Sequence, residues 1–308
     1  MYIGIDVGGT NLKAGLVDGD GAILKTLRMP LDFQGPEAFA KTLADLSRSL
    51  VEGDVSAVES VGMGLPGAVD GGDVLFTTNI PMEHVPLEQL FRRHLNLPLL
   101  LGNDADCAAV GEYFLGAGKG TRDFAVVTLG TGIGAGLILD GRLRGGLASS
   151  EAGHMSICRD GGACNCGRRG CWEYYASATG LIRQTREAMA AHPESALHAL
   201  AERDGCVEGR TAFQAAADGD ETALAVCRQY VAYLADGITN LVNILRPEAV
   251  AIGGGVAAAP EELLLEPLRR RVERESFSRH GGRTTRIVRS ELGNDAGIIG
   301  AALLGRVI

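Results

Sequence analysis

The sequence predicts an α/β protein of two lobes, and three features support this prediction. Its 308 residues exceed the roughly 100 to 200 residues of a single domain. Short apolar runs rich in β-branched residues alternate with amphipathic helical segments, which is typical of sheets covered by helices. Gly9-Thr10 and residues 14–17 (AGLV) recur 121 residues later as Gly130-Thr131 and residues 135–138 (AGLI). We therefore expect two related lobes that present equivalent glycine turns to a cleft.

The first lobe is expected to open with three strands. They are separated by Gly8-Gly9 and by the Asp/Gly-rich turn at 18–21, which is a hairpin signal. An amphipathic helix at 37–50 follows, with its apolar residues three or four positions apart. Apolar runs bounded by Gly and Pro then predict buried parallel strands. The expected strands are residues 2–7, 11–17, 22–27, 58–63 and 97–101.

The second lobe is expected to contain a glycine- and cysteine-rich segment at 145–171, followed by long helices. Apolar residues recur every three or four positions from 221 to 245, and Pro247 ends that helix. A buried strand at 249–252 runs into three glycines. The last elements would be a helix beginning near Pro260 and a helix at 294–304 that packs back on the first lobe. The expected limits are 1–118 with about 294–308 for the smaller lobe, and 119–293 for the larger lobe.

Composition excludes several classes of protein. Lys and Arg number 29 against 38 Asp and Glu, so the formal charge is −9 and a nucleic-acid partner is not expected. No unbroken apolar run approaches the ~18 residues that a membrane span needs. The first residues, MYIGID, carry neither the basic region nor the apolar region of a signal peptide. We expect a cytoplasmic protein that does not contact a membrane.

Residues 6–13 (DVGGTNLK) place a carboxylate at a strand end, followed by a glycine turn. Backbone N–H groups of such a turn can approach an anion closely, and Thr10 and Lys13 add a hydroxyl and an ammonium donor. An ordinary β-turn is the alternative, because glycine is frequent in turns for its conformational freedom alone. The repeat at 130–134 (GTGIG) favours a pair of phosphate-binding turns, as an ATP-dependent phosphotransferase would need.

Two other nucleotide-binding signatures are not met. Residues 118–120 (GKG) have Gly where a P-loop needs Ser or Thr for magnesium. Residues 62–67 (GMGLPG) match G-x-G-x-x-G, but Pro66 and the glycines at 71 and 72 favour a hairpin over the start of a helix. Neither a P-loop nor a dinucleotide-binding fold is therefore expected.

One imidazole and three thiolates form a complete tetrahedral ligand set, which is typical of structural zinc. They belong to His154, Cys164, Cys166 and Cys171. Free thiols or a redox pair are the alternative, but C-x-C is not the C-x-x-C redox spacing. Cys158 is near enough in sequence to replace one ligand. The other cysteines are expected to be small buried hydrophobic residues: Cys107, Cys206 and Cys227.

Three carboxylates stand at positions that suit recognition or catalysis. Glu151 and Glu173 flank the cysteine segment, where a metal-fixed loop would hold them for hydroxyl recognition. Solvated surface glutamates are the alternative for each of them. Asp104 follows an apolar strand at the start of a predicted helix, so it is either a helix N-cap or a base that accepts a hydroxyl proton.

These residues together resemble the ROK family (repressors, open reading frames and sugar kinases), and the resemblance covers essentially the whole chain. The cysteine block at 164–173 is its most specific part. The other matching segments are residues 6–13, 65–67, 78–79, 103–105, 130–136, 151–154 and 253–255. The resemblance implies the two-lobed actin-like ATPase or hexokinase-type fold, which is ribonuclease H-like, with an active-site cleft between the lobes.

The resemblance also implies roles for individual residues. Asp104 would be the general base that takes the proton from the primary hydroxyl of a hexose. His154 would bind structural zinc through one ring nitrogen and the sugar through the other. The remaining sugar-binding positions would be Gly67, Asn79, Asn103, Glu151 and Glu173.

The same resemblance assigns the binding of ATP and Mg²⁺. Asp6 would belong to the magnesium shell, and Gly254 and Gly255 would contact the adenosine. The phosphates would lie against Gly9, Thr10, Asn11, Lys13, Thr131 and Gly132. One difference is that Ser149-Ser150 precede Glu151, where the family usually has a small residue or glycine and then glycine. The E-x-G-H pattern stays intact, and the difference falls at the sugar pocket.

Glucose is the expected substrate, and N-acetylmannosamine, fructose, mannose and allose are the alternatives within the family. The sequence leaves the donor open between ATP, another nucleotide and polyphosphate. The chain is expected to form a homodimer or a homotetramer.

Three interpretations other than a kinase remain. A sugar-responsive ROK regulator would carry a DNA-binding module before the first strand, whereas that strand is expected to begin at Tyr2. A non-catalytic sugar-binding protein would not need Asp104 or the paired glycine turns. A chaperone-type ATPase of the actin superfamily would have no use for Glu151 and Glu173 on a zinc-fixed loop. A sugar kinase is therefore the expected function.

Overall fold

The computed structural model describes residues 1–145, 149–282 and 284–307 and shows a mixed α/β fold. Its residues form two compact units. Unit 1 comprises Met1–Val126, Ala135–Ser150 and Glu291–Ile308, and unit 2 comprises Val127–Gly134 and Glu151–Ser290. The lobe limits expected from the sequence stay a prediction. Residues 146–148 of the predicted cysteine-rich segment lie outside the described residues.

A mixed five-stranded sheet forms the centre of unit 1. Its strand order is β3-β2-β1-β4-β8, with β1, β2 and β3 antiparallel and β1, β4 and β8 parallel. The strands are β1 (Tyr2–Val7), β2 (Asn11–Val17), β3 (Ile23–Pro30), β4 (Ser60–Leu65) and β8 (Leu99–Asn103). All five predicted strands are present, although the last three end two or three residues later than expected. The carboxyl ends of β1, β4 and β8 therefore meet at one edge of the sheet, which is where ligands bind in open α/β sheets.

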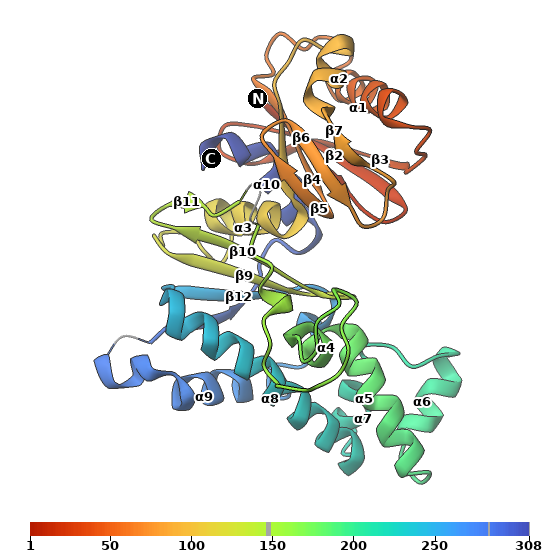
Figure 1. Cartoon of the computed structure of the whole chain (residues 1–308), viewed down its shortest axis with the longest axis vertical. Coiled ribbons are helices and arrows are strands. Elements are labelled where there is room, and N and C mark those ends of the chain that lie inside the picture. Colours follow the sequence, from red (N-terminus) through yellow and green to blue (C-terminus); the bar gives the residue numbers. More distant parts are fainter. Residues whose placement is uncertain (146–148, 283, 308) are drawn as a thin grey trace. The chain divides into compact units, whose positions relative to one another are not determined.

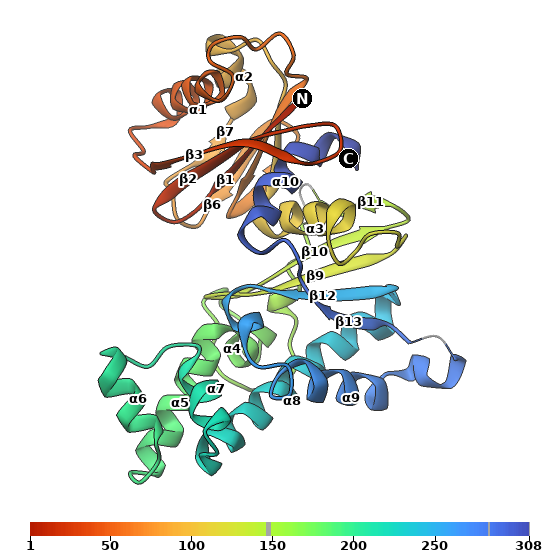
Figure 2. The same ribbon diagram turned by 180° about the vertical axis from the view of Figure 1, so that it is seen from behind.

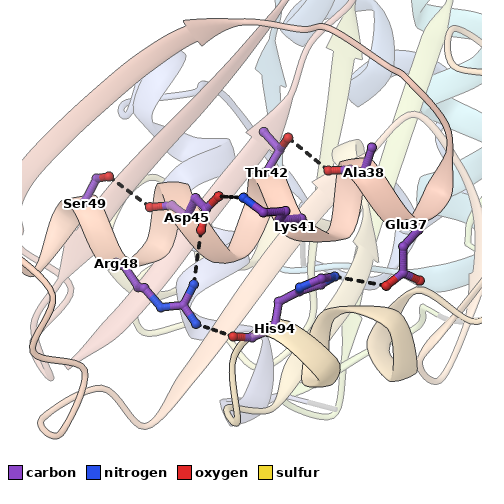
Figure 3. A network of polar contacts seen from close by, with 8 residues as sticks. All are labelled: Glu37, Ala38, Lys41, Thr42, Asp45, Arg48, Ser49 and His94. Carbon is purple, nitrogen blue, oxygen red and sulfur yellow. Dashed lines mark hydrogen bonds and ion pairs between the residues drawn. The ribbon is translucent and has the colours of Figure 1, made fainter.

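Two helices, α1 (Pro36–Leu50) and α2 (Leu87–His94), cover one face of this sheet and lie side by side (Figures 1 and 2). Phe39 and Leu43 of α1 share a buried cluster with Ile3 and Ile5 of β1, as the apolar periodicity of the helix predicts. Polar contacts join the exposed edges of the two helices (Figure 3). His94 Nε2 lies 3.0 Å from Glu37 Oε1, and the guanidinium of Arg48 donates to the His94 carbonyl.

The opposite face of the sheet carries α10 (Ala296–Leu303), which packs on β1, β4 and α3 (Asp104–Leu115). The prediction that the C-terminal helix returns to the first lobe is therefore confirmed. Glycines make this approach possible. A Cβ on Gly4 would lie 1.9 Å from the Ile298 carbonyl oxygen, and a Cβ on Gly62 would lie 1.8 Å from that of Ala301. Backbone then packs on backbone, which a larger residue in either strand would prevent.

We expect Gly62→Ala to lower the free energy of unfolding by about 1–3 kcal/mol or more, because the added methyl overlaps a carbonyl of α10. Urea denaturation of the variant checks this. Gly19→Ala is the matched control, since a Cβ there meets nothing within 4 Å. Equal stability of the two variants would show that α10 can withdraw from β4 at no cost.

A small antiparallel sheet, of order β5-β6-β7, follows the G-x-G-x-x-G match at 62–67. Its strands are β5 (Gly67–Asp70), β6 (Asp73–Thr77) and β7 (Glu83–Val85). The glycine motif thus leads from one strand into a hairpin and not into a helix. This confirms that the motif is not a dinucleotide-binding fingerprint.

The second five-stranded sheet repeats the topology of the first. Its order is β11-β10-β9-β12-β13, and β12 and β13 are parallel. The strands are β9 (Phe124–Leu129), β10 (Ile133–Leu139), β11 (Arg142–Leu143), β12 (Ala249–Gly253) and β13 (Arg286–Arg289). The repeat found in the sequence covers the glycine turn and the strand after it, β2 in one sheet and β10 in the other. The strand order extends the repeat to all five strands. The predicted duplication is therefore confirmed.

Unit 2 is rich in helices, which pack mainly against the long helix α8 (Glu221–Leu245). That helix has the predicted limits. It ends because Arg246 adopts a left-handed conformation, with φ of 51°, directly before Pro247. The other helices of unit 2 are α4 (Trp172–Ala176), α5 (Ala178–Ala191), α6 (Leu197–Asp204), α7 (Thr211–Ala217) and α9 (Leu265–Glu275).

One helix start was predicted wrongly. The helix expected near Pro260 begins only at Leu265, because residues 260–264 form hydrogen-bonded turns first. In these turns the N–H groups of Leu263 and Leu264 both donate to the Pro260 carbonyl. Short 3₁₀ helices complete the chain: η1 (Ala152–His154), η2 (Gly255–Ala258), η3 (Phe277–Gly281), η4 (Gly293–Asp295) and η5 (Leu304–Arg306). Within the described ranges, no helix is both long and apolar enough to cross a membrane.

Candidate active site and metal centre

The predicted site residues divide between the two units. Those in unit 1 are Asp6, Gly9, Thr10, Asn11, Lys13, Gly67, Asn79, Asn103 and Asp104. Those in unit 2 are Thr131, Gly132, Glu151, His154, Cys164, Cys166, Cys171, Glu173, Gly254 and Gly255.

The carboxyl edge of the first sheet carries two carboxylates and a lysine. Asp6 near the end of β1 pairs in register with Lys13 of β2, and Asp104 follows directly after β8. A Cβ on Gly297, in the first turn of α10, would lie 3.2 Å from the Asp6 carboxyl carbon, so this carboxylate abuts the N-terminus of that helix. Its negative charge is favourable there, because unpaired N–H groups give a helix N-terminus a partial positive charge.

The Asp104 side chain is exposed, yet many protein atoms surround its carboxylate. Burial raises the pKa of Asp104, and a hydrogen bond from the Ala105 N–H opposes that shift. Burial also raises the pKa of Asp6, Lys13 lowers it, and the charge of Asp104 raises it again. Two interacting carboxylates with raised pKa values are suited to proton transfer or to binding a divalent cation.

Asn103 and not Asp104 is the N-cap of α3. The Asn103 side-chain oxygen accepts from the Ala105 N–H at 2.8 Å, and its amide group donates to the Gly67 carbonyl at 3.0 Å. The capping role considered for Asp104 is thus performed mainly by its neighbour. Asp104 lies at the first position of the helix as an exposed residue, where its carboxylate can receive a substrate proton.

The glycine turn at residues 8–11 is open on one side. The Gly8 N–H donates to the Asn11 carbonyl at 2.9 Å, and Asn11 Nδ2 donates to Thr10 Oγ1 at 2.7 Å. A Cβ on Gly9 would meet nothing within 4 Å. No protein atom fills that space, so a phosphate could approach the backbone there.

The connection between β6 and β7 lies against this turn. Asn79 is exposed, and its Nδ2 donates to the Gly8 carbonyl at 3.4 Å. The fold itself requires glycine at position 67, since a Cβ there would lie 2.1 Å from the Phe76 carbonyl oxygen. The connection between β6 and β7 thus brings Asn79 to the phosphate turn. The bond from Asn103 holds Gly67, the first residue of β5, at the start of α3.

In unit 2 the four predicted metal ligands come together. One ligand atom from each of His154, Cys164, Cys166 and Cys171 lies within 4.8 Å of all the others. His154 Nδ1 is 3.6 Å from Cys164 Sγ, and Cys166 Sγ is 3.6 Å from Cys171 Sγ. Tetrahedral zinc with Zn–S near 2.3 Å and Zn–N near 2.1 Å needs separations of about 3.6–3.8 Å. The donor set is therefore that of structural zinc, and these two separations match its geometry.

The other cysteines differ in their surroundings. Cys158 is exposed and lies outside the ligand set, with its thiol directed to the Arg159 carbonyl. Cys107 and Cys227 are buried, as predicted. The prediction for Cys206 was wrong, because this residue is exposed after the end of α6. Its flanking Gly205 adopts a left-handed conformation that ends the helix and brings the next residue to the surface.

The two predicted sugar-binding glutamates lie on opposite sides of the His154 ring. Glu151 Oε2 is 3.9 Å from Nε2, and Glu173 Oε1 is 3.3 Å from Nδ1. Glu151 is 65% exposed and can meet a ligand directly, whereas Glu173 is 21% exposed. The Cys164 thiol donates to Glu173 Oε1 at 3.1 Å, so this carboxylate borders the metal ligands as well.

Glu173 also contacts the second glycine turn, which the sequence did not predict. Its Oε2 accepts from the Ile133 N–H at 3.4 Å and would lie 2.6 Å from a Cβ on Gly132. The spacing of 40 residues between Glu173 and Ile133 leaves no local pattern to detect. The signal in the sequence was a glycine at position 132, which permits the close approach.

The predicted adenosine-binding glycines follow β12. Gly254 has φ of 82°, and a Cβ there would lie 2.5 Å from the Leu129 carbonyl oxygen. A Cβ on Gly255 would meet nothing within 4 Å. Gly254 is therefore required by the fold itself, while Gly255 leaves an open surface for a ligand.

Comparison with known proteins identifies the same family that the sequence motifs resemble. The family model that describes the ROK family matches residues 2–307. The chain is 37% identical to the protein named Glucokinase of Streptomyces coelicolor, covering 99% of this chain and 98% of that one. It is 28% identical to the Xylose repressor of Bacillus subtilis, covering 97% of this chain and 75% of the repressor.

A solved structure is similar over its full length. It is the ROK family glucokinase from Streptomyces griseus in complex with glucose and AMPPNP, which is 37% identical, with a TM-score of 0.79 and 99% of both chains covered. The fold is thus the two-lobed actin-like, or hexokinase-type, α/β fold that the sequence predicts. On this evidence the chain belongs to the ROK family.

Proposed function

We propose that the protein is a sugar kinase that transfers the γ-phosphoryl group of ATP to the 6-hydroxyl of glucose. The observation that carries this proposal is the carboxyl edge of the first sheet. There a solvent-exposed Asp104, a second carboxylate at Asp6 and an open glycine turn belong to one compact unit. The similarity to glucokinases over the full chain supports it, including one that is bound to glucose and AMPPNP.

The chemistry requires one base and the neutralisation of phosphate charge. Asp104 takes the proton from the attacking hydroxyl, whose oxygen forms a bond to the γ-phosphorus. The bond from the γ-phosphorus to the bridging oxygen then breaks, and ADP leaves with the negative charge. Bound Mg²⁺ neutralises charge on the phosphates, and the Asp6 carboxylate is the group of this chain that would hold it. Lys13, paired in register with Asp6, adds a positive charge at the same edge.

Five further residues are the candidates for binding the other sugar hydroxyls. Asn79 and Asn103 act from unit 1 beside the Gly67 loop. Glu151, Glu173 and the Nε2 of His154 act from unit 2. Zinc fixes the loop that carries these three residues and takes no part in making or breaking bonds.

The nucleotide is bound by the glycine turns. The phosphates lie against Gly9, Thr10, Asn11, Lys13, Thr131 and Gly132, and the adenosine contacts Gly254 and Gly255. The open space beside Gly9 and Gly255 supports this assignment, because a backbone without side chains allows close approach.

Gly9→Ala tests the phosphate turn without disturbing the fold. The new Cβ would meet no protein atom within 4 Å, so the melting temperature is expected to stay at the wild-type value. The methyl would occupy the space of a phosphate oxygen, and we expect the Kd for ATP to rise about tenfold or more, which corresponds to ~1.4 kcal/mol. Isothermal titration measures it, with Gly19→Ala as the control. If Gly9→Ala binds ATP with the wild-type Kd, this turn is not part of the nucleotide site.

A coupled assay of ADP release tests the proposed reaction. It compares glucose, N-acetylmannosamine, fructose, mannose and allose with ATP and Mg²⁺, and then repeats the best sugar with polyphosphate as the donor. We expect glucose to give the highest kcat/KM. If another hexose gives the highest kcat/KM, the proposal of a sugar kinase stands and the proposal of glucose as its substrate is wrong.

If a hexose binds but none stimulates ADP release, the kinase proposal fails. A non-catalytic, sugar-responsive regulator then becomes the better account. The homodimer or homotetramer and the cytoplasmic location expected from the sequence stay predictions.

A further inference from the structure

The zinc-binding segment of unit 2 continues directly into a set of hydrogen bonds to the second glycine turn. The Ala178 N–H donates to the Gly130 carbonyl at 2.8 Å. The Thr179 hydroxyl donates to the Thr131 carbonyl, also at 2.8 Å. Together with the bond between Glu173 and Ile133, residues 173–179 contact the turn at three residues.

These contacts follow from the way α5 begins. Ser177 is its N-cap, and the Ser177 side chain accepts from the Gly180 N–H at 3.0 Å. The first N–H groups of a helix have no partner inside the helix, so the Ala178 N–H is available for the turn. Thr179 in the same helical turn adds its hydroxyl beside it. The Gly130 and Thr131 carbonyls thus point at the start of α5.

The same segment is fixed at its other end by the cysteine loop and by packing. It begins next to the metal ligand Cys171, and Trp172 is fully buried with its indole N–H bonded to the Tyr233 carbonyl at 3.0 Å. Gly153, which directly precedes His154, also touches the turn, since a Cβ there would lie 2.3 Å from the Ile133 carbonyl oxygen. The metal loop and the glycine turn are therefore parts of one structural element.

We propose that Thr179 is a positioning residue for nucleotide binding, which holds the glycine turn at 130–134 in the orientation that receives the phosphates. This inference rests on the proposed function, since that function assigns Thr131 and Gly132 to the phosphates. Thr179 acts through the Thr131 carbonyl, to which its hydroxyl donates. Its loss should therefore weaken nucleotide binding and leave sugar binding and zinc content unchanged.

The test compares Thr179→Val, which removes the hydroxyl at nearly constant shape, with Thr179→Ser, which keeps it. Titration with a non-hydrolysable ATP analogue is expected to give a Kd about three- to tenfold higher for the valine variant, as for one lost hydrogen bond. The serine variant should bind like the wild type. Glucose affinity and zinc content should be the same in all three proteins.

Thr185→Val is the matched control in the same helix. Its hydroxyl donates to the Leu181 carbonyl at 2.8 Å within α5 and does not touch the turn. Any effect that comes from α5 alone would appear in this variant as well. We expect its nucleotide affinity to equal that of the wild type.

A second readout does not depend on nucleotide binding. Hydrogen exchange of the peptide over residues 127–136 should be faster in Thr179→Val than in Thr179→Ser or Thr185→Val. Exchange and nucleotide affinity equal to the wild type would overturn the proposal. Faster exchange in a protein whose wild type binds no nucleotide would instead overturn the proposed function and, with it, the nucleotide role of Thr179.

Discussion

Asp104→Asn is expected to lower kcat by about 10²- to 10⁴-fold while the Kd values for sugar and ATP stay close to those of the wild type. A general base contributes a factor of this size, and asparagine keeps the shape and the hydrogen bond to Ala105 but cannot accept the proton. Steady-state turnover with titration of both substrates measures the two effects separately. Asp73→Asn, at an exposed position of β6, is the control.

The raised pKa of Asp104 gives the direction of two further effects. The proton must be absent for Asp104 to act as a base, so kcat should fall as the pH falls through the raised pKa. Because the folded protein favours the protonated form, the ionised carboxylate disfavours folding at pH values above about 4, the ordinary pKa of aspartate. The melting temperature of Asp104→Asn at pH 7 should thus equal or exceed that of the wild type. A variant with near wild-type kcat would exclude Asp104 as the base.

Cys166→Ser is expected to abolish stoichiometric zinc binding and to reduce sugar affinity strongly. Structural zinc sites contribute on the order of 10 kcal/mol of binding energy, and a closed four-ligand site loses most of it with one ligand. Cys166 is itself exposed, so the substitution creates no cavity in a hydrophobic core. Metal analysis of the purified protein and sugar titration give the result.

The control for this experiment is Cys158→Ser, which changes an exposed thiol of the same loop outside the ligand set. It should keep its zinc and its sugar affinity. A Cys166→Ser protein that retains one zinc per chain would show that another residue completes the site. Retained sugar affinity after loss of zinc would separate the metal from sugar recognition.

The fold could be predicted largely because its strongest signals are local. The limits of α8 follow from apolar residues at helical spacing, an aspartate N-cap and Pro247. The start of α9 was predicted too early because leucines at helical spacing also occur in the turn that precedes the helix. Apolar periodicity alone does not distinguish such a turn from the first helical residues. Cys206 was placed wrongly because burial depends on neighbours that are remote in sequence.

The metal ligands and the glycine turns were also visible in the sequence. The residue types of His154, Cys164, Cys166 and Cys171 define the chemistry of a zinc site, and the short spacing within the loop nearly defines its geometry. The repeat at 9 and 130 likewise marks both turns, because a duplicated motif keeps its glycines where the backbone must approach a ligand.

The sequence by itself determined the α/β class, the duplicated topology and the residue types of the site, because these depend on periodicity, an internal repeat and short spacing. Its motifs also carry the resemblance to the ROK family. Only the tertiary structure showed that Asn103 caps α3 beside Asp104, that Glu173 borders both the metal ligands and Gly132, and that Thr179 holds the Thr131 carbonyl. The last two contacts join residues 40 or more positions apart. Such contacts form only when the chain has folded, so no local pattern records them.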